Sequence, residues 1–147
     1  MSEQYYSYNH CIKDCKTLLP QLKKYNPDGL VAIARGGLTI GHILAHGLNT
    51  NNLFSINCIH YHNQQKMDTF KISNIPDLQE YKKIVLVDDI VDSGETIIEI
   101  KKALEKKYKN TEFKIATLFY KTTASIKPDF TVNEATKWIN FFWEVDL

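Results

Sequence analysis

Carboxylates and hydroxyls gather around one glycine between residues 88 and 96. In chain order these side chains are Asp88, Asp89, Asp92, Ser93, Glu95 and Thr96, with Gly94 among them. Free backbone N–H groups beside a glycine suit a phosphate, whereas adjacent carboxylates suit sugar hydroxyls, Mg²⁺ or a proton in transfer. The segment therefore predicts one loop that binds a phosphate through its backbone and a polyol or a metal through its side chains.

The residues on either side of this loop predict the elements that position it. The apolar run at residues 84–87 is typical of a buried strand, which we expect to span residues 81–89. Apolar residues recur at helical spacing after the loop and predict a helix over residues 95–108. The carboxylates would then lie at the carboxyl edge of a sheet, where open α/β sheets bind ligands.

A second loop, at residues 34–37, also joins an expected strand to an expected helix. The side chain of Arg35 and the N–H groups of Gly36 and Gly37 can converge there on an anion. A nucleotide P-loop is excluded, because His42 stands where that motif needs lysine and Ile43 where it needs a hydroxyl. The loop is therefore a second candidate site for an anion.

The rest of the chain alternates between helical and strand patterns, without a linker or an internal repeat. We expect helices over residues 8–25 and 37–48, and strands over residues 30–34, 53–61, 69–72 and 113–120. Pro20 is expected to divide or bend the first helix, and residues 128–147 to be irregular. This order predicts a single α/β domain over residues 1–147, with a mainly parallel central sheet flanked by helices.

Residues 84–96 resemble the phosphoribosyl pyrophosphate (PRPP) binding motif of the type I phosphoribosyltransferases. The resemblance implies the fold of that family, with a small hood formed by the C-terminal tail. It implies that Asp88 and Asp89 hold the ribose hydroxyls and Mg²⁺. The residues that would wrap the 5-phosphate are Asp92, Ser93, Gly94, Glu95 and Thr96.

The loop at residues 34–37 fits the same resemblance. In the type I phosphoribosyltransferases a glycine-rich loop that carries arginine or lysine binds pyrophosphate at this place, which assigns Arg35, Gly36 and Gly37 to that role. Several relatives hold the loop with a cis peptide that is not followed by proline. In this chain that peptide would join Ala34 to Arg35.

Two features of the C-terminal part resemble the 6-oxopurine branch of the family, most closely the short bacterial xanthine-guanine phosphoribosyltransferases. Lys121 follows the strand expected at residues 113–120, and Trp138 and Ile139 lie in an aromatic segment. In that branch the lysine donates to the 6-oxygen of the base, and the Trp-Ile pair packs on the purine ring. The resemblance therefore assigns base binding to these three residues.

The activity that the resemblance implies is transfer of the phosphoribosyl group from PRPP to guanine, xanthine or hypoxanthine, with release of pyrophosphate. Asp92 is expected to accept the proton of the purine imidazole ring, and residues 61–68 to close over the site as a lid. His60, Thr122 and Phe142 depart from the pattern of the relatives, at positions that bear on loop closure and on the base pocket. Two alternatives remain open, a phosphoribosyltransferase for another base and a non-catalytic regulator that senses PRPP or a nucleotide.

Composition also bears on the partners and the location of the protein. The formal net charge of +1 favours neither nucleic acid nor an anionic membrane, and no apolar segment is long enough to span a bilayer. The three cysteines form no obvious disulfide framework, which favours the cytoplasm. Neither His42 with His46 nor His60 with His62 has an evident third ligand for zinc. The family resemblance implies a homodimer or a homotetramer.

Overall fold

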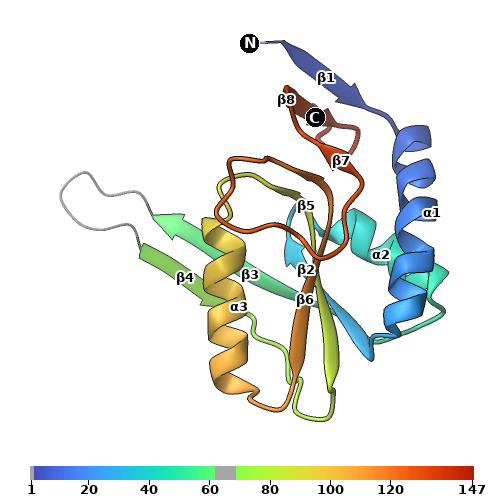
Figure 1. Cartoon of the computed structure of the whole chain (residues 1–147). Coiled ribbons are helices and arrows are strands. Elements are labelled where there is room, and N and C mark those ends of the chain that lie inside the picture. The colour runs from blue at the N-terminus through green and yellow to red at the C-terminus, as the bar shows by residue number, and fades with distance from the viewer. Residues whose placement is uncertain (1, 62–68) are drawn as a thin grey trace.

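The computed structural model describes residues 2–61 and 69–147, and a six-stranded sheet runs through its centre (Figure 1). The strand order is β4 (Thr69–Ser73), β3 (Leu53–Tyr61), β2 (Gly29–Ala34), β5 (Lys83–Val91), β6 (Glu112–Tyr120) and β7 (Asn133–Glu134). Neighbouring strands are parallel except at one edge, where β4 runs antiparallel to β3. The predicted α/β fold with a mainly parallel sheet is therefore confirmed.

Helices cover both faces of this sheet, which explains why its central strands are apolar throughout. α1 (Tyr8–Tyr25) and α2 (Leu38–Gly47) lie on one face and α3 (Glu95–Lys107) on the other (Figure 1). Successive side chains of β5 point to opposite faces, so that Val85 packs on the α1 side and Ile84 on the α3 side. The unbroken apolar run before Asp88 therefore reflects a strand that is buried on both faces.

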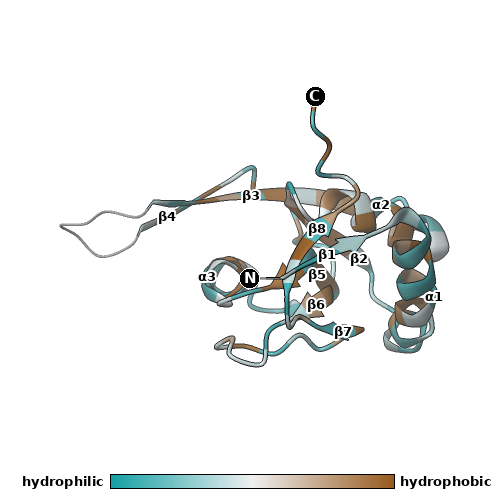
Figure 2. Cartoon of the chain, turned by 90° about the horizontal axis from the view of Figure 1, so that it is seen from above, coloured by the Kyte–Doolittle hydropathy of each residue, from teal (hydrophilic) through white to brown (hydrophobic). Residues whose placement is uncertain are grey.

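α1 spans the residues that its sequence pattern predicts. Ser7 caps its start by accepting the N–H of His10 at 3.1 Å, and Asn26 ends it in a left-handed conformation. The helix continues through Pro20, which therefore does not divide it, while the alternative that Pro20 bends the helix stays a prediction. Pro20 is exposed, and the carbonyl group that its missing N–H leaves without a helical partner can bind water. Figure 2 shows that the side of α1 away from the sheet is largely hydrophilic.

The two ends of the chain meet in a separate two-stranded sheet that the sequence did not predict. β1 (Glu3–Tyr6) pairs in parallel with β8 (Trp138–Phe141), beside the carboxyl edge of the main sheet (Figure 1). The expectation of an irregular tail is therefore wrong at β7 and β8, whereas the rest of residues 128–147 forms no helix and no further strand. Pairing between segments so far apart leaves no local signal in the sequence, which is why periodicity missed it.

Tyr6 anchors this two-stranded sheet to α1 and to the main sheet. Its O–H donates to Oδ2 of the buried Asp14 in α1 at 2.6 Å, and the side-chain amide of Asn133 in β7 donates to the same oxygen at 2.8 Å. Its ring packs edge to face against Phe119 and Phe141. Burial, followed by the hydrogen bond to Asp14, raises the pKa of the Tyr6 phenol, which therefore remains a hydrogen-bond donor.

The strand that carries the acidic pair is longer than predicted. β5 continues to Val91 because it stays paired with β6, with Asp88 opposite Thr117 and Ile90 opposite Phe119. Asp88 and Asp89 therefore lie within the last residues of the strand rather than after its end. The helix that follows begins at Glu95, as predicted.

Other expectations concern the membrane, the cysteines and the lid. Among the helices in residues 2–61 and 69–147, none is long and apolar enough to cross a membrane.

Cys11, Cys15 and Cys58 are free thiols, and the first two are buried on α1. The lid predicted at residues 61–68 falls almost entirely outside the described residues, so it stays a prediction.

Candidate active site

The carboxyl edge of the main sheet brings together three loops that are far apart in the sequence. The loop after β2 carries residues 35–37, the loop after β5 carries residues 92–94, and the segment after β6 begins with Lys121. These strands are adjacent and parallel, so their carboxyl ends lie side by side. The residues that the sequence singled out therefore collect in one region of the molecule.

Short local hydrogen bonds orient the two carboxylates near the end of β5. Oδ1 of Asp88 accepts the N–H of Asp89 at 2.9 Å, and Oδ1 of Asp89 accepts the N–H of Ile90 at 2.7 Å. Burial, together with the charge of Asp89, raises the pKa of Asp88 well above its usual range. Burial also raises the pKa of Asp89. Two desolvated carboxylates side by side favour a partner that donates hydrogen bonds or brings positive charge.

The loop after β5 lines a cavity of about 240 Å³ that the acidic pair also borders. Its wall includes Asp92, Ser93, Gly94 and Thr96, whereas the exposed side chain of Glu95 is not part of it. Gly94 has a φ of 90°, a left-handed conformation that glycine adopts without strain, and it precedes the first residue of α3. A cavity at the start of a helix, walled by backbone and two hydroxyls, can bind a phosphate.

The loop at residues 35–37 approaches the acidic pair closely. A side chain at Gly36 would collide with the carboxylate of Asp89, so glycine is what allows this loop to approach the end of β5. Arg35 lines a larger cavity of about 950 Å³, together with Glu144 and Asp146 of the tail. This is the arginine that the sequence assigned to an anion.

The other two features of that loop concern its backbone. The Ala34–Arg35 peptide is cis, as the family resemblance implies. Gly37 donates its N–H to the carbonyl of Ile33 at 2.8 Å, and a side chain at this position would collide with the backbone of Val87. Gly37 thus shapes the turn between β2 and α2, and its predicted contact with pyrophosphate stays a prediction.

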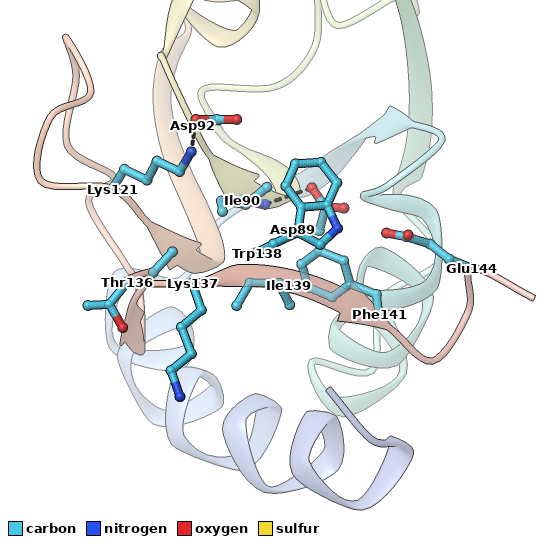
Figure 3. Close-up of a pocket in the computed structure, with 11 residues that line it drawn as sticks. Asp89, Ile90, Asp92, Lys121, Thr136, Lys137, Trp138, Ile139, Phe141 and Glu144 are labelled. Atoms are coloured by element: carbon cyan, nitrogen blue, oxygen red, sulfur yellow. Dashed lines mark hydrogen bonds and ion pairs between the residues drawn. The ribbon is translucent and has the colours of Figure 1, made fainter. Parts of the chain in front are cut away.

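A third cavity, of about 250 Å³, opens between the end of β5, the segment after β6, and β8 (Figure 3). The residues that line it are Asp89, Ile90, Asp92, Lys121, Ala135, Thr136, Lys137, Trp138, Ile139, Phe141 and Glu144. Nζ of Lys121 lies 2.6 Å from Oδ1 of Asp92. The structure thus brings the predicted base-binding residues and the candidate proton acceptor into one pocket.

Trp138 and Ile139 contribute different surfaces to this pocket. Ile139 is buried, whereas Trp138 is 55% exposed. The Nε1–H group of Trp138 donates to the side chain of Asn140 at 3.1 Å, which holds the indole ring. A flat aromatic face that is open on one side suits a flat heterocycle.

Sequence reasoning assigned no role to six residues that line this pocket: Ile90, Ala135, Thr136, Lys137, Phe141 and Glu144. Phe141 is buried, contacts Tyr6 edge to face and stacks on Trp143 with ring centroids 4.7 Å apart. The carboxylate of Glu144 points toward Asp89 (Figure 3), and its charge adds to the rise in the pKa of Asp89 that burial causes. An acidic residue directly after an aromatic run was the only available signal for Glu144.

The carboxylates of the site also bear on the metal prediction. Within the parts of the chain that the structure describes, no group of three or more His, Cys, Asp or Glu side chains can hold a metal ion. Mg²⁺ needs no such group, because one or two carboxylates with substrate oxygens and water complete its shell. The desolvated pair Asp88 and Asp89 fits that mode of binding. Among the described residues, the His42–His46 pair belongs to no such group.

Comparisons with known proteins agree with this arrangement. The protein-family model described as the phosphoribosyl transferase domain matches residues 1–147 of this chain. The chain is similar to the xanthine-guanine-hypoxanthine phosphoribosyltransferase of Helicobacter pylori, with a TM-score of 0.91, 37% identity, and coverage of 98% of this chain and 95% of the other. It is also similar to a purine phosphoribosyltransferase of Pyrococcus horikoshii, with a TM-score of 0.86, 31% identity, and coverage of 100% and 97%.

Sequence comparison alone gives the same family. The chain is 28% identical over 156 residues to a xanthine-guanine phosphoribosyltransferase of Roseobacter denitrificans, which covers 96% of this chain and 85% of the relative. Three findings lead to the same family assignment. They are the strand-loop-helix unit with its acidic pair, the arginine loop with its cis peptide, and the match to the domain family. The chain belongs to the phosphoribosyltransferase family.

Proposed function

We propose that this protein transfers the 5-phosphoribosyl group of PRPP to a 6-oxopurine base, namely guanine, xanthine or hypoxanthine. The observation that carries the proposal is the position of Lys121, whose ammonium group lies in the aromatic pocket beside Asp92. An ammonium group can only donate, so it favours a 6-oxo group and rejects a 6-amino group. The names of the relatives support the same class of base.

The reaction is a displacement at the anomeric carbon of PRPP. An imidazole nitrogen of the purine forms the new C–N bond while the C–O bond to pyrophosphate breaks, and the proton of the imidazole ring passes to a base. Asp92 is the proposed acceptor, because it lines both the cavity of about 250 Å³, here called the base pocket, and the cavity of about 240 Å³, here called the phosphate cavity, beside the loop of residues 92–94, the phosphate loop. General-base catalysis of this kind contributes about 10²–10⁴-fold to the rate.

The remaining roles follow from the cavities that each group lines. Asp88 and Asp89 would bind the ribose hydroxyls and hold Mg²⁺, which supplies positive charge to the departing pyrophosphate. The backbone and hydroxyls of residues 92–96 would bind the 5-phosphate. Arg35 and Gly36 would bind the pyrophosphate group, and Arg35 would offset the charge that develops on it.

In the base pocket, Trp138 and Ile139 would bind the purine ring. The exposed indole of Trp138 offers a stacking surface, and the backbone of β8 offers polar groups to the edge of the base. Phe141 would support this wall from behind, because it is buried between the pocket and Tyr6.

The proposal extends to assembly and location. Tyr5 and Tyr8 near the N-terminus are 64% and 58% exposed, which supports self-association into a homodimer or a homotetramer. Static light scattering on the purified chain would show a mass of two or four subunits, and the mass of a monomer would contradict this. The three free thiols support a cytoplasmic location.

An assay of pyrophosphate release tests the proposed activity. The purified protein is mixed with PRPP, Mg²⁺ and one of guanine, hypoxanthine, xanthine or adenine. We expect turnover with at least one of the three 6-oxopurines and little with adenine. Turnover with adenine alone would assign the protein to another base, and no turnover with any base would favour a non-catalytic regulator.

A further inference from the structure

The segment that follows β6 lies against the phosphate loop along its length. This segment, residues 121–126, is here called the strap. The N–H of Lys121 donates to the carbonyl of Val91 at 2.9 Å, and the N–H of Ser125 donates to the carbonyl of Ser93 at 2.9 Å. The strap thus bonds to the last residue of β5 and to the loop after it, with one backbone bond on each side of Asp92.

Ser125 makes a second bond to the same acceptor. Its Oγ–H also donates to the carbonyl oxygen of Ser93 at 2.9 Å, so this single oxygen accepts two hydrogen bonds from one residue. The approach is close, because a side chain at the buried Gly94 would come within 3.1 Å of Oγ of Ser125 and 3.0 Å of Ile126. Ser125 therefore holds the peptide between Ser93 and Gly94 on the side away from the phosphate cavity.

The orientation of the Ser93–Gly94 peptide also determines where the N–H group of Gly94 points. In a trans peptide the C=O and N–H groups point in opposite directions. The carbonyl of Ser93 points to Ser125, so the N–H of Gly94 points the other way, and Gly94 lines the phosphate cavity. A bond that fixes the carbonyl on one side thereby aims a hydrogen-bond donor into the cavity on the other.

We propose that Ser125 is a positioning residue for the 5-phosphate of PRPP. It acts through the Ser93–Gly94 peptide, whose N–H it directs at the phosphate, and it does not touch the substrate itself. The same strap begins with Lys121, which forms the ion pair with Asp92 in the base pocket. The strap therefore links the residue proposed to recognise the base to the loop proposed to bind the phosphate. This inference rests on the proposed function.

The test uses Ser125→Ala, which removes only the hydroxyl and keeps the backbone bond, together with Ser125→Thr, which restores a hydroxyl. A matched control is Thr111→Val, because Oγ1 of Thr111 donates to the carbonyl of Tyr81 at 2.7 Å at the opposite end of the sheet. Calorimetric titrations measure the affinity of each variant for ribose 5-phosphate and, separately, for pyrophosphate with Mg²⁺. Thermal unfolding is followed in parallel.

We expect Ser125→Ala to bind ribose 5-phosphate about threefold to tenfold more weakly, the loss that one hydrogen bond explains. Its affinity for pyrophosphate should match that of the unmodified protein, and Ser125→Thr should recover most of the loss. Thr111→Val should bind both probes normally. Unchanged affinity of Ser125→Ala for ribose 5-phosphate, or equal weakening of both probes, would overturn the proposal.

The titrations separate this inference from the proposed activity. They need no turnover, so an inactive protein whose affinity for ribose 5-phosphate falls in Ser125→Ala would contradict the proposed function and leave the positioning role standing. An active protein whose Ser125→Ala variant binds ribose 5-phosphate normally would contradict only the positioning role. If the unmodified protein does not bind ribose 5-phosphate, the positioning role is wrong.

Discussion

The side of the site proposed to bind the phosphate groups, here the phosphate side, and the side proposed to bind the purine, here the base side, differ in how the chain builds them. The phosphate side is one continuous segment, residues 88–96, with a short loop at residues 35–37 beside it. The base side joins the segment after β6 to β8, and β8 depends on pairing with β1 at the other end of the chain. The phosphate side is therefore formed mainly by residues that are close together in the sequence. The base side forms only when the two ends of the chain pair.

The largest effect is expected where the two sides share a residue. Asp92→Asn keeps the size of the side chain and a hydrogen-bond acceptor near Lys121, but it removes the proposed proton acceptor. Turnover should fall by about 10²–10⁴-fold while the KM for PRPP stays close to its original value. Steady-state kinetics with each substrate varied in turn gives both quantities, and an unchanged kcat would remove Asp92 from this role.

Lys121→Met tests the base side alone. The change keeps the length of the side chain but removes the charged donor to the 6-oxygen, so the kcat/KM for hypoxanthine should fall about 10–100-fold. The preference for hypoxanthine over adenine should shrink with it. Kinetics with both bases measures the two effects. Since Lys101 lies on α3 outside the lining of the pocket, Lys101→Met should leave both values unchanged.

Tyr6→Phe tests whether the base side depends on the end of the chain. Asp14 would lose one of its two side-chain donors, and the protein should lose about 1–3 kcal/mol of the free energy of unfolding. The KM for the base should rise because β8 loosens, while the KM for PRPP should not change.

The matched control for this variant is Tyr25→Phe. The Tyr25 hydroxyl donates at 2.9 Å to Glu112, which is exposed and lies at the far end of the sheet. Chemical unfolding and substrate kinetics on both variants separate lost stability from a loosened base pocket. An increase in both KM values for Tyr6→Phe would show that the two sides are not independent.

Asp88→Asn tests the phosphate side through stability. Burial and the charge of Asp89 raise the pKa of Asp88 in the folded protein, so folding disfavours the ionised form that the unfolded chain carries at neutral pH. Whether the folded protein buries that charge or takes up a proton, the cost at pH 7 is absent in the variant, which should be more stable by about 0.5–2 kcal/mol and should bind PRPP more weakly. A stability gain with unchanged PRPP affinity would contradict the role assigned to Asp88.

The same variant has an expected pH dependence. A folded-state pKa above the unfolded value means that the folded protein binds more protons, so ionisation of Asp88 costs stability as the pH rises. The advantage of Asp88→Asn should therefore be small near pH 4 and grow toward neutral pH. Unfolding curves between these values measure it, and an advantage that shrinks with rising pH would contradict the account.

The contrast between the two sides also explains what the sequence could predict. The alternation of strands and helices from α1 to β6, the start of a helix at Glu95 and the positions of the two candidate anion loops follow from local periodicity and turn residues, and the structure agrees with them. β1, β8 and the anchoring of Tyr6 on Asp14 were missed, because they arise from contacts between distant segments. Lys121 and Trp138 were found through resemblance, whereas Phe141 and Glu144 needed the folded chain to reveal them.

The most direct test of the account is a competition between hypoxanthine and adenine at equal concentrations, with PRPP and Mg²⁺. These bases differ at the 6-position that Lys121 is proposed to recognise, and the ratio of the two nucleoside monophosphates formed equals the ratio of their kcat/KM values. We predict a ratio of about 10³ or more in favour of the hypoxanthine product. Equal amounts of the two products, or an excess of the adenine product, would contradict the assignment of the base site.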